Sequence, residues 1–269
     1  MKGESRMTTE AHDTREIQDI GYGREFEGFY DRIFPKDDYA DLAAAKIAER
    51  HPGGGLRSLE FGVGTGRIAI PLAARTGAVV GVDSSTEMLE QLRAEIKEKD
   101  ADVVPVHGDI RTYTDDEKYG LVYCVCATLS IILDAGEQRE VIRRAADRLA
   151  PGGTLVIETP NRGGVRAIHE GRRRTSYFVP YAEPNTGLLT CSTLTPDDRI
   201  WQASHIWFEG GTSRVGTELS RLVTPEEIDE YAAEAGLEPV DRQADWLGNP
   251  YTDTSLMFIS AYRHAGERR

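Results

Sequence analysis

The chain has 269 residues, a formal net charge of -13 at pH 7 and an isoelectric point of about 5.0. This length suffices for one α/β domain that buries a sizeable core and carries an insertion or a small lid. The acidic balance argues against RNA or DNA as a partner, because nucleic-acid binders usually present a basic face to phosphates. No apolar run approaches the roughly 20 residues of a membrane span. The polar N-terminal residues resemble neither a signal peptide nor a basic targeting helix.

The three cysteines, Cys124, Cys126 and Cys191, do not have the spacing of a metal site. Free thiols are typical of a reducing compartment, so we expect a cytoplasmic protein. We expect no metal, because the sequence shows no group of histidines and carboxylates with ligand-like spacing.

Aromatic residues are frequent between Tyr22 and Phe34. This pattern predicts a helix that packs its rings on the core. It is equally compatible with a cap over a bound cofactor, with Tyr30 near that cofactor and Tyr22 near the substrate. An alanine-rich helix is expected over residues 41–49, ended by a Pro-Gly-Gly segment.

A glycine-rich segment at residues 60–67 lies between a short apolar run and a helical pattern. Glycines allow a tight turn and a close approach to a ligand, and the following helix start presents free N–H groups. The third glycine, Gly66, comes one residue earlier than in the dinucleotide-binding motif, where Arg67 stands instead. The carboxylate of Glu60 would repel a pyrophosphate, but it suits a ligand that carries a cationic amine.

Further apolar runs follow at residues 78–83, 103–107, 121–126 and 149–158. Continuous apolar runs are typical of parallel strands that are covered on both faces. Asp83 ends the first of these runs, where an acid can bind the ribose hydroxyls of an adenosine. After the next run, Asp109 is placed to accept a hydrogen bond from the adenine amine, with Ile110 over the ring. Helices are expected up to about residue 98, starting at Ser84 or Ser85, and over residues 138–149.

Taken together, these segments resemble the class I S-adenosylmethionine-dependent methyltransferases. The likeness is close over about residues 25–160 and looser through the helix start at residues 224–227. It rests on the glycine loop, on the strand end at Asp83, on Gly108-Asp109-Ile110, and on Leu149-Ala150-Pro151-Gly152-Gly153. More narrowly, the chain is similar to small-molecule methyltransferases of bacterial secondary metabolism, including amino-sugar N-methyltransferases, which carry an element like Phe29-Tyr30-Asp31.

The resemblance implies a Rossmann-like α/β fold with a mostly parallel seven-stranded sheet and an antiparallel insertion after the fifth strand. We expect a helical cap over residues 1–54, the cofactor-binding core over 55–160, a substrate-binding insertion over 161–222, and a helix and strands over 223–269 that complete the core. Within the insertion, three strands are expected at residues 188–195, 199–208 and 213–222. The arginine-rich stretch at 162–174 is interpreted as a loop, either solvated or acting as a lid over the substrate.

The resemblance also implies a site for S-adenosylmethionine, which is converted to S-adenosylhomocysteine. Glu60 and the loop backbone would bind the methionine part, Asp83 the ribose, and Asp109 with Ile110 the adenine. Cys126, expected at the end of the fourth strand, would lie beneath the sulfonium. The full predicted cofactor set is Tyr30, Glu60, Gly62, Gly64, Gly66, Arg67, Asp83, Ser84, Met88, Asp109, Ile110 and Cys126.

The catalytic group is less directly indicated. Some relatives carry a histidine just after the fourth strand, but here that stretch is Ala127-Thr128-Leu129-Ser130. His205, in the middle strand of the insertion, is therefore the predicted base, and Tyr30 is predicted to assist at the reacting methyl group.

The predicted activity is methyl transfer to a nitrogen or oxygen of a small molecule, by a monomer or homodimer without nucleic-acid or membrane partners. The alternatives are C-methylation or cyclisation with the same cofactor, and a non-catalytic S-adenosylmethionine binder. A nicotinamide-dependent dehydrogenase is disfavoured by Glu60 and by the early Gly66.

Overall fold

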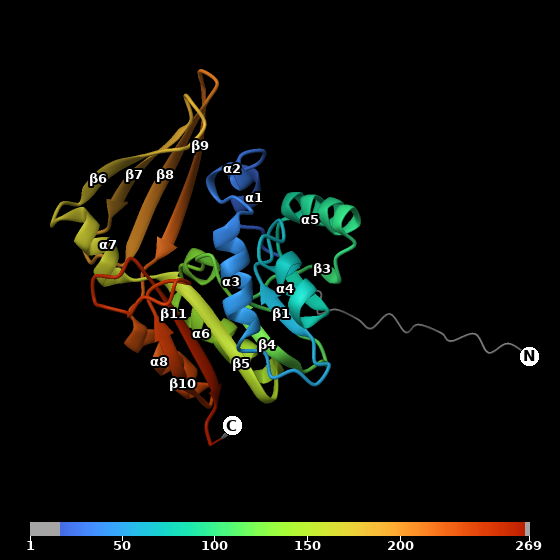
Figure 1. Ribbon diagram of the computed structural model, residues 1–269. Coiled ribbons are helices and arrows are strands. Elements are labelled where there is room, and N and C mark those ends of the chain that lie inside the picture. Colours follow the sequence, from blue (N-terminus) through green and yellow to red (C-terminus); the bar gives the residue numbers. More distant parts are fainter. Residues whose placement is uncertain (1–16, 267–269) are drawn as a thin grey trace, which may run out of the picture.

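The computed structural model describes residues 17–266, and the predictions made for residues 1–16 and 267–269 lie outside that range. A seven-stranded sheet with the order β10-β11-β5-β4-β1-β2-β3 forms the centre (Figure 1). Its strands are β1 (Ser58–Phe61), β2 (Val79–Asp83), β3 (Val103–His107), β4 (Tyr119–Cys124), β5 (Leu149–Pro160), β10 (Leu237–Gln243) and β11 (Met257–His264). The first five pair in parallel, whereas β11 is antiparallel to both β5 and β10. The predicted fold class is confirmed.

Helices cover both faces of this sheet, which explains why its central strands β1, β2 and β4 are largely apolar and buried. They are α3 (Asp38–Ala48), α4 (Ala69–Thr76), α5 (Thr86–Lys99), α6 (Ala135–Arg148) and α8 (Pro225–Glu234). One buried cluster joins the sheet to α3, α4 and α5, through residues such as Ala44, Leu72 and Leu89. A second joins the opposite face to α6 and α8, through Ile142 and Ile228. The core therefore has three layers.

Side-chain caps fix where several of these helices begin. The Ser85 hydroxyl accepts a hydrogen bond from the backbone N–H of Met88 at 3.2 Å, so Ser85 rather than Ser84 starts α5. Thr224 accepts from the backbone N–H of Glu227 at the start of α8, as the sequence at residues 224–227 predicts.

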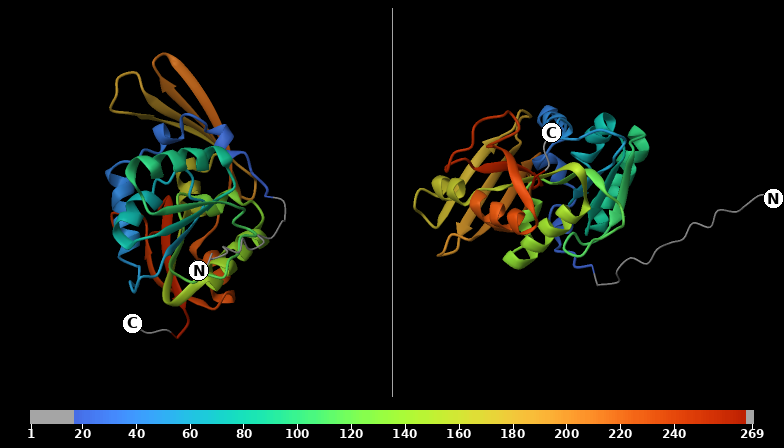
Figure 2. Two further views of the ribbon diagram at one scale, coloured as in Figure 1. Left: turned by 90° about the vertical axis from the view of Figure 1, so that its right-hand side faces the viewer. Right: turned by 90° about the horizontal axis from the view of Figure 1, so that it is seen from below.

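A second, four-stranded antiparallel sheet with the order β6-β7-β8-β9 is inserted after β5. Its strands are β6 (Arg174–Pro180), β7 (Gly187–Leu194), β8 (Ile200–Glu209) and β9 (Thr212–Arg221). Figure 2 shows this sheet rising from one end of the core. The short helices α1 (Tyr22–Glu25) and α2 (Tyr30–Ile33) lie beside it, and Phe26 and Phe29 form a buried cluster with Leu188 and Trp207.

The prediction of a loop at residues 162–174 was wrong. The segment forms α7 (Arg162–His169) and then leads into β6. Asn161 caps the helix by accepting a hydrogen bond from the backbone N–H of Gly163. The expected three strands are four, because β6 pairs along its length with β7. Most β6 side chains are exposed, so this edge strand lacks the alternation of buried apolar and exposed polar residues from which a strand is usually predicted.

The predicted position of Cys126 at the end of the fourth strand was also wrong. Strand β4 ends at Cys124, and Cys126 has a left-handed backbone with φ 54°. Its backbone N–H donates to the Glu158 carboxylate at 2.8 Å, and the Thr128 hydroxyl donates to the Val125 carbonyl. These side chains turn the chain out of the strand and toward the cavity described below.

Candidate active site

A cavity of about 850 Å³ lies at the carboxyl ends of the parallel strands, between the core, the N-terminal helices and β9. Parallel α/β sheets bind ligands at this edge, at the point where the connections after two neighbouring strands cross to opposite faces of the sheet. In this sheet that point is at β1, which lies between β2 and β4. The volume lies within the roughly 300–1,000 Å³ of small-molecule sites. Among the predicted cofactor residues, those that line the cavity are Tyr30, Gly62, Gly64, Asp83, Ser84, Met88, Asp109, Ile110 and Cys126.

Asp83 organises the cofactor end of the cavity. One carboxylate oxygen accepts the Gly64 backbone N–H at 2.8 Å, and the other accepts the Ser85 backbone N–H at 2.9 Å. Burial raises the pKa of this carboxyl, and the two backbone bonds partly offset the effect. The side chain thus ties the glycine loop to the start of α5 while facing the cavity.

Gly62 takes a conformation that only glycine adopts easily, with φ 80°. A Cβ atom at this position would lie 2.3 Å from Cγ2 of Thr128. The backbone N–H of Gly62 donates to the Val82 carbonyl at 2.8 Å, which holds the loop against the end of β2. The glycine loop is therefore packed tightly between β2 and the segment after β4.

Asp109 and Ile110 line the cavity at the end of β3. Asp109 is 6% exposed, and its carboxylate receives hydrogen bonds from the side chain and the backbone N–H of Arg111. Burial opposes ionisation, but these bonds outweigh it and lower the pKa of Asp109. The group is a fixed anion whose orientation is set by Arg111, a residue that the sequence did not single out.

Four predicted site residues do not line the cavity: Glu60, Gly66, Arg67 and His205. Glu60 lies behind the glycine loop, 3% exposed, and accepts a hydrogen bond from the Tyr123 hydroxyl at 2.9 Å. Burial raises the pKa of the Glu60 carboxyl. Arg67 donates to the Pro35 carbonyl and, through Nη1, to Sγ of Cys126 at 3.2 Å, so it supports Cys126 from behind.

The opposite end of the cavity is built by β8, β9 and α1. Gln202, Thr217, Glu218 and Leu219 line it, and none of them was singled out from the sequence. The predicted base, His205, lies behind Glu218, with its Nε2 at 3.5 Å from Oε1 of that carboxylate. The only signal in the sequence is that Glu218 falls in an expected strand, and strand pairing is needed to place it beside His205.

Cys126 lines the cavity between the cofactor end and the end built by the inserted sheet. Burial raises the pKa of its thiol to about 12, and the nearby Glu158 carboxylate acts in the same direction. We therefore expect Cys126 to react with iodoacetamide at least about tenfold more slowly than the exposed Cys191, because the thiolate is the reactive form. Peptide mass spectrometry after timed labelling checks this, and equal rates would contradict the environment described for Cys126. Added S-adenosylhomocysteine should slow Cys126 further while leaving Cys191 unchanged.

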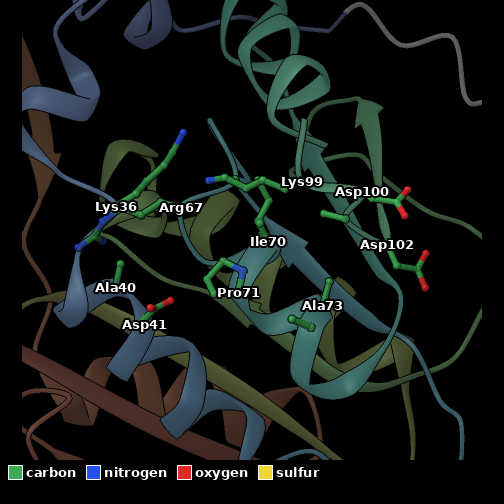
Figure 3. A pocket seen from close by; sticks show the side chains of 13 residues that line it. Lys36, Ala40, Asp41, Arg67, Ile70, Pro71, Ala73, Lys99, Asp100 and Asp102 are labelled. Carbon is green, nitrogen blue, oxygen red and sulfur yellow. The ribbon is translucent and has the colours of Figure 1, made fainter. Parts of the chain in front are cut away.

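A second hollow, of about 530 Å³, lies between α3 and α4 and is shown in Figure 3 with Lys36, Arg67 and Lys99 at its upper edge. Both lysines are paired, Lys36 with Asp31 and Glu95, and Lys99 with Glu95. We assign no ligand to this hollow.

The topology, the glycine loop, and the acids after β2 and β3 define the class: the chain is an S-adenosylmethionine-dependent methyltransferase. Comparison with known proteins agrees. A methyltransferase domain family matches residues 59–153. The CcbJ methyltransferase from Streptomyces caelestis is 32% identical, with a TM-score of 0.80, over 91% of this chain and 98% of that one. The chain belongs to this methyltransferase family, and the predicted enzyme class and cofactor are confirmed.

Two further relatives differ in coverage. A putative methyltransferase of Geobacillus sp. (strain WCH70) is 25% identical over 241 residues, which are 86% of this chain and 94% of that protein. The dTDP-3-amino-3,6-dideoxy-alpha-D-glucopyranose N,N-dimethyltransferase of Streptomyces fradiae is 29% identical over 143 residues, 51% of this chain and 54% of that protein.

No helix within residues 17–266 has both the length and the apolar composition needed to cross a membrane. Over the same residues, histidine, cysteine and carboxylate side chains form no group that could hold a metal ion.

Proposed function

We propose that the enzyme transfers a methyl group to a nitrogen or oxygen of a small molecule, in bacterial secondary metabolism. The observation that carries this proposal is the cavity of about 850 Å³, which is lined at one end by the strand termini of the core and at the other by the inserted sheet. An amino sugar is a suitable acceptor, given the sugar N,N-dimethyltransferase among the relatives. The volume of the cavity, about 850 Å³, favours a small acceptor over a macromolecule.

We also propose the following roles. Asp83 binds the ribose hydroxyls, Asp109 and Ile110 the adenine, and Ser84 and Met88 flank the adenosine. The backbone of residues 62–66 holds the methionine part, and Glu60, when ionised, attracts its amine from behind the loop. Cys126, supported by Arg67, lies beneath the sulfur. Asp83, Asp109, Ile110, Ser84, Met88 and Cys126 line the cavity, whereas Glu60 and Arg67 would act from behind it.

S-adenosylmethionine supplies an activated methyl group with a good leaving group, so the protein contributes mainly alignment and a dry environment. The end of the cavity that would bind the acceptor can align it, because the aromatic rings of Tyr22 and Tyr30 line the cavity there. Tyr22 stacks on Phe26 with centroids 4.5 Å apart and meets Tyr30 edge-on at 6.1 Å. We propose that residues 1–54 cap the site, 55–160 bind the cofactor, 161–222 bind the acceptor and 223–269 complete the core. We further propose that the enzyme acts in the cytoplasm, as a monomer or homodimer.

The proposal predicts that label from methyl-labelled S-adenosylmethionine is transferred to a small-molecule acceptor. The acceptors to test in parallel are amino sugars and their dTDP conjugates, phenols, carboxylic acids, amino acids and bulk tRNA. Asp83→Ala is the control that should strongly reduce transfer, because it weakens cofactor binding. Label on tRNA would contradict the acceptor class. Tight cofactor binding without transfer to any acceptor would indicate a non-catalytic binder and contradict the proposed activity.

A further inference from the structure

We propose that Glu218 is the acceptor-binding carboxylate: it holds a protonated amine of the acceptor beside the methyl donor and takes its proton, with His205 positioned behind it. This inference rests on the proposed function and narrows it to nitrogen methylation. It replaces a single histidine base with a carboxylate–histidine pair of which only the carboxylate lines the cavity.

Strand register creates the pair. Glu218 in β9 lies opposite Ala203 in β8, and His205 is two residues further along β8, so both side chains are on the same face of the sheet. The His205 ring is fixed from two sides, by the Thr190 hydroxyl at 3.0 Å from Nδ1 and by Glu218 at 3.5 Å from Nε2. The side chain of His205 is 8% exposed and that of Glu218 is 13% exposed.

Tyr22 connects Glu218 to the place where the methyl group would lie. Burial, and then the nearby Glu218 carboxylate, raise the pKa of Tyr22. Tyr22 in turn meets the Tyr30 ring, and Tyr30 and Cys126 line the same cavity. An acceptor atom held by Glu218 is thus directed toward Tyr30 and Cys126.

The charges around Glu218 favour a cationic ligand. Within residues 17–266, the ion-pair partner of Glu218 is His205, which is a cation only when protonated. The other ionisable groups that face it are the phenols of Tyr22 and, from β6, Tyr177. By contrast, Asp109 on the far wall is neutralised by Arg111. A largely buried carboxylate without a fixed cation is costly, and an ammonium group of the acceptor offsets that cost.

The proton balance is simple. The acceptor enters as an ammonium ion, and one N–H proton moves to the Glu218 carboxylate, from which His205 Nε2 can accept it. The nitrogen lone pair then forms the N–C bond, the C–S bond breaks, and its electron pair stays on sulfur, which becomes a neutral thioether. The product leaves as an N-methylated ammonium ion, and the proton on the pair returns to solvent. A hydroxyl acceptor carries no positive charge for the Glu218 carboxylate to bind, so this arrangement favours an amine.

The test compares Glu218→Gln with Glu238→Gln, a matched change on the exposed strand β10. The probe is dTDP-3-amino-3,6-dideoxyglucose, with the corresponding 3-hydroxy sugar nucleotide and a simple phenol as non-amine acceptors. For Glu218→Gln we expect KM for the amine to rise at least about tenfold and kcat to fall, with S-adenosylmethionine affinity within about twofold of wild type. Glu238→Gln should behave as wild type.

Two further variants separate chemistry from folding. Glu218→Asp keeps the charge and should recover part of the activity. His205→Asn should change the shape of the pH profile of kcat/KM without changing cofactor affinity. A purely structural role for His205 would leave the shape of that profile unchanged.

The outcomes distinguish the two proposals. Methyl transfer to the hydroxyl or phenol but not to the amine overturns the role of Glu218 and leaves the proposed methyltransferase function intact. Wild-type kinetics on the amine for Glu218→Gln also overturn it. Cofactor binding with no transfer to any of the acceptors overturns both.

Discussion

Replacing Asp83 with alanine is expected to weaken S-adenosylmethionine binding about 100-fold or more. The substitution removes a carboxylate that faces the cavity and accepts hydrogen bonds from Gly64 and Ser85. Each charge-assisted bond contributes roughly 1.5–3 kcal/mol, and two such bonds to a ribose correspond to at least this loss of affinity. The substitution also removes the hydrogen bond that holds the glycine loop in place. This adds to the loss of affinity, because the loop backbone must keep its position to bind the methionine part.

Isothermal calorimetry with S-adenosylmethionine and S-adenosylhomocysteine measures this directly. Asp83→Asn removes the charge and one of the two acceptor oxygens, while its amide oxygen can still accept the Gly64 N–H, so its affinity should fall between those of wild type and Asp83→Ala. Asp102→Ala changes an exposed acid just before β3 and should leave affinity unchanged. If Asp83→Ala bound the cofactor as wild type does, the assignment of the cavity to the cofactor would be wrong.

Replacing Gly164 with alanine is expected to destabilise the fold by roughly 3 kcal/mol, at the upper end of overpacking effects. A Cβ atom there would lie 2.1 Å from the Ser255 carbonyl oxygen and 2.6 Å from Cα of Leu256. Both are backbone atoms, which cannot move aside as a flexible side chain can. The Asn161 side chain fixes the same contact by donating to the carbonyls of Asp253 and Ser255, at 3.0 and 2.8 Å.

Thermal unfolding checks this prediction, with an expected fall in Tm of about 10 °C for a chain of this size. The matched control is Gly136→Ala in the first turn of α6, where the new methyl group would meet no backbone atom and one side-chain atom, Oδ1 of the capping residue Asp134, at 3.0 Å. Alanine is the better helix former, so the control should be neutral or slightly stabilising. A Gly164→Ala protein as stable as wild type would show that α7 does not pack tightly on the segment at residues 253–256.

The core could be predicted because its signals are local. Apolar runs, glycines and the acids at strand ends lie within short windows, and together they indicated the class, the cofactor and nine cofactor residues that line the cavity. Asp83 and Asp109 were predicted because each follows a strand, and the ends of parallel strands meet at one edge of a sheet.

The inserted sheet and the acceptor end were harder to predict for a physical reason. Strand β6 is an exposed edge held by backbone hydrogen bonds to β7, and backbone bonds leave little trace in the side-chain pattern. Helix α7 is anchored by a segment about 90 residues further along the chain, through Asn161. Contacts of this range cannot be read from the window of sequence around them.

By itself, then, the sequence determined the class of enzyme, the cofactor and the Asp83 end of the site, because those follow from residue order along strands and turns. Only the tertiary structure decided which side chains meet at the acceptor end. Strand pairing placed Glu218 between His205 and the cavity, and packing of α1 brought Tyr22 against it. Such pairs depend on register between distant strands, where a shift of one residue turns every side chain to the other face.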